Sequence, residues 1–158
     1  MTVTVITVGS LKESYLREAV AEYKKRLSQY ARVEEAELSE VKSHDEEDSS
    51  EISRALDAEA DKILSRLPRD AYKIALCVEG KMLCSEELAK EVRRAGDGSG
   101  KLALVIGSSH GLSERVKAAC DLRLSFSRLT MPHQLIRVNL YEALYRSFTI
   151  INGKKYHK

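Results

Sequence analysis

The sequence predicts an α/β protein with a mainly parallel sheet and helices on both faces. Strand-like and helix-like segments alternate along the 158 residues, which is typical of parallel strands joined by crossover helices. Two short runs, 71–79 (AYKIALCVE) and 101–107 (KLALVIG), are apolar almost throughout, as expected of central strands covered on both faces. No repeat or linker divides the chain, so we expect residues 1–158 to form a single domain.

The first part of the chain alternates between the two periodicities. Segment 3–9 (VTVITVG) is β-branched and ends at a glycine, whereas segment 13–30 carries apolar residues at helical spacing with basic residues between them. A helix after the polar stretch stops before Pro68. The expected order is a strand at 3–9, a helix at 13–30, a strand at 33–38, a polar loop at 42–50 and a helix at 51–66.

The second part continues the alternation up to a long final helix. We expect a strand at 71–79, a helix at 85–95, a strand at 101–107, a helix at 113–119, a strand at 121–125 and a helix at 132–149. In parallel α/β sheets ligands bind beyond the carboxyl ends of the strands. Three of those ends carry a glycine, at Gly9, Gly80 and Gly107. The sequence therefore predicts a binding site at this edge.

Composition and cysteine usage indicate a globular cytoplasmic protein. The chain is 43% hydrophobic and 32% charged, and no apolar run approaches the roughly 20 residues that cross a membrane. The start, MTVTVITVGS, lacks the basic region and cleavage site of a signal peptide. Three cysteines form no CxxC pair, so we expect buried free thiols, neither a disulfide framework nor a metal site.

The formal net charge of +2 hides an asymmetry along the chain. Residues 115–158 hold nine Lys and Arg against two acids, which leaves 17 against 22 in residues 1–114. A basic end on a nearly neutral chain favours a local anionic partner such as RNA phosphate; a solvated basic surface is the alternative. The acidic stretch 34–51 would repel phosphate, so nucleic acid should lie away from it.

The glycine turn in 105–115 (VIGSSHGLSER) allows several interpretations. It lacks the Lys-Ser/Thr of a P-loop and the spacing of a dinucleotide fingerprint. It does satisfy G-x-S-x-G, with Ser109 as nucleophile and Asp121 followed by His133 or His157 as partners, which would indicate a serine hydrolase. Against this, the chain is short for that fold and Asp121 follows only twelve residues later, at a strand start.

The simpler interpretation of the turn concerns backbone access. Gly107 removes a side chain where a ligand would approach the strand end, and exposed amides of the turn would bind its polar groups. A turn with a purely structural role remains the alternative.

Motifs over the whole chain resemble one family. The C-terminal part reads IGSSHGL, LSFSRLTMPHQLIR, EALYRS and KKYHK, with further matches in VITVGSLKESYL and ALCVEGKMLCSEELA. These motifs resemble the SPOUT-class ribosomal RNA large-subunit methyltransferase H family, which methylates N3 of a pseudouridine in 23S ribosomal RNA. Three positions depart from the family pattern: Ser108 for a glycine, Cys77 for an aspartate and Ala143 for a glutamine.

The resemblance implies a C-terminal trefoil knot and an S-adenosylmethionine site built from three loops. Leu76 is expected to offer an apolar surface and Gly107 to let the ligand approach. The third loop would wrap the cofactor with main-chain donors and acceptors, through Phe126, Ser127, Arg128, Leu129, Thr130 and Met131.

The resemblance also implies the catalytic groups. The imide must lose its proton, so a base is useful, and the candidates are His157, Tyr156 and Arg146, supported by Glu142 and His133. Each has a plainer role: Glu142 and Arg146 could form a helix ion pair, His133 could fix the loop by a hydrogen bond, and the residues 156–158 could be disordered.

Family members act as homodimers on the assembled 70S ribosome, without a metal. The apolar stripe of the final helix serves either the dimer or the core: Leu135, Val138, Leu144, Tyr145 and Phe148. Besides the methyltransferase, two functions stay open, a serine hydrolase using Ser109 and a catalytically silent RNA- or ribosome-binding module.

Overall fold

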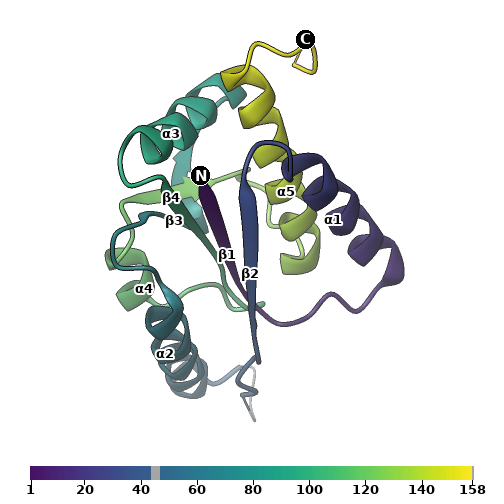
Figure 1. Ribbon diagram of the computed structural model, residues 1–158. Helices are drawn as coiled ribbons and strands as arrows, with labels where there is room; N and C mark the ends of the chain where they lie inside the picture. The colour runs from purple at the N-terminus through teal and green to yellow at the C-terminus, as the bar shows by residue number, and fades with distance from the viewer. Residues whose placement is uncertain (44–46, 158) are drawn as a thin grey trace.

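The computed structural model describes residues 1–43 and 47–157. Within them strands and helices alternate as predicted (Figure 1). Residues 44–46 of the predicted polar loop, and Lys158 of the predicted tail, lie outside the described residues. The elements are β1 (Thr2–Val8), α1 (Ser14–Leu27), β2 (Arg32–Leu38), α2 (Ser49–Arg66), β3 (Tyr72–Met82), α3 (Ser85–Asp97), β4 (Lys101–Ile106), α4 (Glu114–Ala118), β5 (Leu122–Ser125) and α5 (His133–Ile151).

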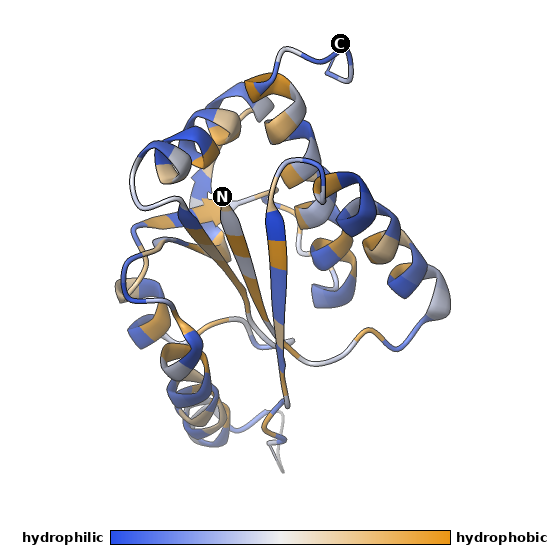
Figure 2. Ribbon diagram, in the orientation of Figure 1, coloured by the Kyte–Doolittle hydropathy of each residue, from blue (hydrophilic) through white to orange (hydrophobic). Residues whose placement is uncertain are grey.

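The strands form one parallel sheet in the order β2-β1-β4-β3-β5. In β1, Val5 is in register with Glu35 of β2 on one side and Leu104 of β4 on the other. Strand β2 lies at an edge, and Figure 2 shows polar and apolar residues alternating along it. Because all strands run the same way, their carboxyl ends meet at one edge of the sheet.

Helices cover both faces of the sheet, as predicted. Val3 and Val5 point to the face covered by α1, α3 and α5, whereas Ile6 and Val8 point to the face covered by α2 and α4. Each face has its own buried apolar cluster. Among the described helices none is long and apolar enough to cross a membrane. The trefoil knot implied by the family resemblance stays a prediction.

Strand β3 is longer than predicted because it contains a bulge. Leu76 and Lys81 both align with Leu124 of β5, so residues 77–80 project from the sheet between them. A Cβ on Gly80 would lie 2.6 Å from the carbonyl carbon of Leu124, so this position needs glycine. The bulge turns Cys77 toward the carboxyl edge of the sheet.

The buried side chain of Arg137 attaches the final helix, α5, to strand β2 of the sheet. Arg137 is only 5% exposed, and its guanidinium donates to Glu35 (Nε to Oε1, 3.0 Å) and to Glu37 (Nη1 to Oε2, 2.9 Å). Glu35 is also paired with Lys24 of α1, at 2.9 Å. This network joins β2, α1 and α5. Hydrogen bonding and charge from Lys24 and Arg137 outweigh burial and lower the pKa of the Glu35 carboxyl.

Two sequence predictions are resolved by burial. Leu144 and Phe148 of the α5 stripe are core residues, whereas Leu135 is 41% exposed. The three cysteines are free, but the prediction that they are buried was wrong: Cys84 is exposed, and the other two are half-buried.

Candidate functional site

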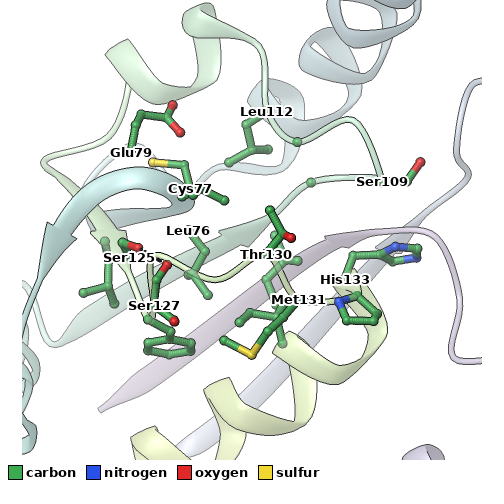
Figure 3. A pocket seen from close by; sticks show the side chains of 18 of the residues that line it. Leu76, Cys77, Glu79, Ser109, Leu112, Ser125, Ser127, Thr130, Met131 and His133 are labelled. Atoms are coloured by element: carbon green, nitrogen blue, oxygen red, sulfur yellow. Dashed lines mark hydrogen bonds between the residues drawn. The ribbon is translucent and has the colours of Figure 1, made fainter. Parts of the chain in front are cut away.

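A cavity of about 390 Å³ lies at the carboxyl ends of β3, β4 and β5 (Figure 3). This is the edge where the sequence predicted a binding site. Three segments that are distant in sequence form its wall: the end of β3 with its bulge, the turn after β4, and the segment that leads from β5 into α5. The lining residues are Leu76, Cys77, Val78, Glu79, Ile106–Leu112, Lys117, Leu124–Ser127, Leu129–His133 and Ile136.

Nearly all predicted cofactor-contact residues lie in this wall. Leu76, Gly107, Phe126, Ser127 and the run Leu129–Met131 line the cavity. Arg128 is the exception, since it is not among the lining residues. The Arg128 side chain is exposed.

The turn after β4 requires glycine at position 107 for a reason other than the predicted one. A Cβ on Gly107 would collide with the carbonyl oxygen of Gly111, and Leu112 Cδ2 would lie 3.0 Å away. The turn is closed by a hydrogen bond from the Gly111 N–H to the Ser108 carbonyl oxygen, at 2.9 Å. Gly107 therefore permits the chain to fold back on itself, and the resulting turn forms the cavity wall.

Ser108, which departs from the family pattern, has a buried partner that sequence reasoning missed. Its hydroxyl donates to Glu59 Oε2 at 2.9 Å, and Glu59 Oε1 accepts from the Val41 N–H at 2.9 Å. Glu59 is 2% exposed, so both carboxylate oxygens are satisfied where water is excluded. The sequence did offer one sign that Glu59 is buried: its spacing places it on the same helix face as Ala55 and Ile63.

Hydroxyl groups stabilise the segment between β5 and α5. The Ser125 hydroxyl donates to the Ser127 carbonyl oxygen at 2.9 Å, and the Ser127 hydroxyl accepts from the Leu129 N–H at 3.0 Å. Farther along, the Asn139 side-chain amide lies 3.5 Å from the Met131 sulfur. These contacts explain the serine-rich entry to α5: its hydroxyl groups shape a loop that lines the cavity.

The β3 bulge contributes a polar wall. Lys117 of α4 pairs with Glu79 and with Glu114, the latter at 2.9 Å. The hydrogen bond from Lys117 lowers the pKa of the Glu79 carboxyl, and burial raises the pKa of the Cys77 thiol. Cys77 is therefore a neutral thiol in this wall, and the lysine compensates the charge of Glu79.

The predicted catalytic residues form a second cluster at the far end of α5. Arg146 Nη2 donates to Glu142 Oε1 at 2.5 Å, which confirms the predicted helix ion pair. The Tyr156 hydroxyl donates to the same oxygen at 3.2 Å, and the Arg146 guanidinium lies over the Tyr156 ring, 4.9 Å from its centre. Tyr156 also packs edge-on against Tyr145, with ring centres 4.8 Å apart. Residues 156–157 are thus ordered on the helix.

His157 is held between two helices. Its Nε2 lies 2.8 Å from Glu86 Oε1 of α3, and its Nδ1 lies 3.5 Å from Arg146 Nη1 of α5. The side chain is 31% exposed. The end of the described chain is therefore fixed by one contact on each ring nitrogen.

The cavity lies at the start of α5, whereas the tail cluster, defined as Glu142, Arg146, Tyr156 and His157, lies toward the end of this helix. Figure 1 shows the course of α5 between the two. His133, at the start of the helix, lines the cavity; Arg146 is thirteen residues later, roughly 20 Å along the axis at 1.5 Å per residue. The His133 side chain has no hydrogen-bond partner among the described residues. One chain does not bring its tail cluster to its own cavity.

The geometry contradicts the serine-hydrolase alternative. Asp121 Oδ2 accepts from the Lys73 N–H at 2.7 Å, at the amino end of β3 and so at the opposite edge of the sheet from Ser109. The Ser109 hydroxyl instead contacts Glu40 Oε1 at 3.3 Å. Among the described residues neither Asp121, His133 nor His157 contacts the Ser109 hydroxyl, so the predicted Ser-Asp-His triad is not assembled.

Comparison with known proteins decides the family. A family model described as "Predicted SPOUT methyltransferase" matches residues 1–157. The chain belongs to the SPOUT methyltransferase family.

Within residues 1–43 and 47–157, no cluster of three or more His, Cys, Asp or Glu could hold a metal ion.

Close relatives of this SPOUT methyltransferase share its full length. Proteins named ribosomal RNA large subunit methyltransferase H from Shouchella clausii, Bacillus pumilus and Listeria monocytogenes serovar 1/2a are 43%, 45% and 46% identical to it, over 100% of both chains. A solved structure of a probable methylase family protein from Haemophilus influenzae has a TM-score of 0.57 at 16% identity, covering 99% of this chain and 70% of that one. The latter likeness concerns the fold alone.

Proposed function

We propose that this SPOUT methyltransferase transfers a methyl group from S-adenosylmethionine to N3 of a pseudouridine in 23S ribosomal RNA. The observation that carries the proposal is the identity of 43–46% over the full length of relatives named ribosomal RNA large subunit methyltransferase H. The enzyme would act in the cytoplasm on the assembled 70S ribosome, as a homodimer of single-domain chains.

The cavity at the sheet edge suits the methyl donor. Its volume lies in the range of small-molecule sites, and Leu76, Leu112 and Phe126 offer apolar surface to an adenine. The turn and the β5–α5 segment add main-chain donors and acceptors beside them. When bound, the donor supplies a sulfonium-activated methyl group, so the protein mainly has to orient the donor and the acceptor.

The tail cluster supports an assignment of the base. Burial raises the pKa of Tyr156 to about 12, so its phenol holds its proton at neutral pH. The hydrogen bond to Glu142 raises the pKa of Arg146, which therefore stays cationic. His157 is left as the proton acceptor, since a neutral imidazole carries a lone pair on one ring nitrogen. Arg146 would stabilise the negative charge on the deprotonated imide.

The separation of roughly 20 Å along α5 supports a dimeric site. A base must come within hydrogen-bond reach of the proton that it removes, and one chain holds its tail cluster at the wrong end of α5. A second copy could present its tail cluster at the cavity of the first. The exposed Leu135 and Leu129, at the cavity end, offer apolar surface for that contact.

Two measurements test the proposal. Calorimetric titration with S-adenosylmethionine should show binding, and ribosomes lacking the modification should accept labelled methyl at one pseudouridine. Removing residues 156–158 should spare cofactor binding and abolish transfer, because the cavity stays intact. A catalytically silent binding module would bind ribosomes without methylating them, and that result would overturn the proposal.

A mixing experiment tests the dimeric site. A chain lacking residues 156–158 is combined with a chain whose cavity wall is disrupted by Gly107→Ala. If the tail acts on the partner's cavity, the mixture regains activity that neither chain has alone. No recovery, with mixed dimers demonstrated by mass spectrometry, would contradict a tail supplied by the second copy.

A further inference from the structure

We propose that Glu86, in the first turn of α3, is a positioning residue for methyl transfer. It holds Nε2 of His157 and so keeps Nδ1 as the nitrogen that accepts the proton. This inference rests on the role of His157 in the proposed function. Glu86 lies 71 positions before His157 in the sequence, and no motif connects the two.

The contact between Glu86 and His157 shows which ring nitrogen of His157 carries the hydrogen. Glu86 Oε1 lies 2.8 Å from His157 Nε2. A hydrogen bond from its own backbone N–H, and then one from His157, lower the pKa of the Glu86 carboxyl to about 2. Glu86 is therefore ionised at any pH at which the enzyme works, and an ionised carboxylate only accepts hydrogen bonds. Nε2 must carry the hydrogen of this bond.

The other ring nitrogen faces the opposite kind of group. Arg146 Nη1 lies 3.5 Å from Nδ1, and a guanidinium only donates. A hydrogen on Nδ1 would point at this cation, whereas a lone pair there is favoured. Both contacts are satisfied together only by a neutral imidazole with its hydrogen on Nε2. The hydrogen bond on one nitrogen thus decides the state of the other.

This arrangement suits the removal of the imide proton. The proton on N3 passes to the Nδ1 lone pair, the N–H electron pair stays on N3 as the nucleophile, and the ring becomes an imidazolium with a proton on each nitrogen. Glu86 stabilises that positive charge from the Nε2 side. Arg146, released from Nδ1, lies beside the developing imide anion. The charged and titratable groups around the ring are Glu86 of α3, Glu142 and Arg146 of α5, and Tyr156 of the tail.

A neighbouring carboxylate on the same helix provides a matched control. Glu87 Oε2 accepts from the Cys84 N–H at 2.8 Å and so caps α3, without contacting His157. Glu87→Gln removes one negative charge from the same turn, as Glu86→Gln does. A general effect of charge near the helix start would appear in both variants, whereas positioning of His157 would appear in only one.

The test joins spectroscopy to kinetics. The ring nitrogens of His157, assigned with the His157→Gln variant, are followed by nitrogen-15 NMR in the full-length protein. In Glu86→Gln we expect the ratio of the Nε2–H to the Nδ1–H tautomer to fall by about fivefold, the effect of an exposed pair. Glu87→Gln should leave this ratio unchanged.

Kinetics should follow the same direction. Glu86→Gln should lower kcat on ribosomes by about fivefold, because a smaller share of the His157 rings presents the Nδ1 lone pair to the imide proton. KM for ribosomes and the affinity for S-adenosylmethionine should not change. Glu86→Asp, which keeps the charge, should recover part of the rate.

Two results would overturn the inference: an unchanged tautomer ratio of His157 in Glu86→Gln, or a changed tautomer ratio with an unchanged kcat. The proposed function fails on a different observation, namely a wild-type chain that does not methylate ribosomes. The NMR comparison requires no turnover, so the two failures are distinguishable.

Discussion

Replacing Gly107 by alanine should disrupt the turn after β4 and weaken cofactor binding together. The added Cβ would collide with the carbonyl oxygen of Gly111 and lie 2.5 Å from its carbonyl carbon, whereas ordinary contacts begin near 3.4 Å. Both clashes involve backbone, which cannot rotate away as a flexible side chain can. The Gly111 peptide must therefore move.

The expected cost follows from what that movement breaks. The Gly111 N–H loses its 2.9 Å bond to the Ser108 carbonyl, which contributes about 1 kcal/mol. Forcing an additional methyl group into a packed site costs a further ~1–3 kcal/mol. We expect the free energy of unfolding to fall by about 2–4 kcal/mol, with a lower affinity for S-adenosylmethionine because the displaced residues line the cavity.

Urea unfolding at fixed protein concentration and calorimetric titration would measure both effects. Gly153→Ala is the matched control: Gly153 has φ +62° with open space around its Cβ position, so only the left-handed backbone costs about 1 kcal/mol. It lies after α5, at the end of the helix away from the cavity, and cofactor affinity should not change. A Gly107→Ala protein as stable as wild type, with wild-type affinity, would refute the steric reasoning.

Four further substitutions test separate parts of the structure. Arg137→Met should destabilise the fold by about 3 kcal/mol at neutral pH in urea. Because the folded-state pKa of Glu35 is lowered, its contribution is lost as the pH falls through that pKa, and the gap between variant and wild type should narrow in acid. Ser109→Ala should leave methyl transfer to ribosomes unchanged; a loss of several orders of magnitude would restore a catalytic role for this hydroxyl. Leu144→Ala should cost about 2–5 kcal/mol in urea, whereas Leu135→Ala should cost under about 0.5 kcal/mol and weaken dimers in sedimentation; equal losses of stability would contradict the assigned burial.

The sequence alone determined the order of the elements and the location of the cavity. Periodicity and turn residues are local properties, so they predicted each helix and strand within a few residues. Parallel strands gather their carboxyl ends at one edge, which placed Gly80 and Gly107 together before any contact was known, whereas Leu76 and the 126–131 segment were implied by the family resemblance. The family motifs added the identity of the loops.

Only the tertiary structure decided the features that depend on contacts between distant segments. The clash that demands glycine at 107, the Ser108–Glu59 bond and the bulge opposite Leu124 each depend on how two backbones approach, which no local pattern encodes. The same holds for the tail. Sequence reasoning could name His157. It could not show that the length of α5 separates His157 from the cavity of its own chain, or that His157 contacts Glu86. Distance along a helix, not composition, determines which groups can act together.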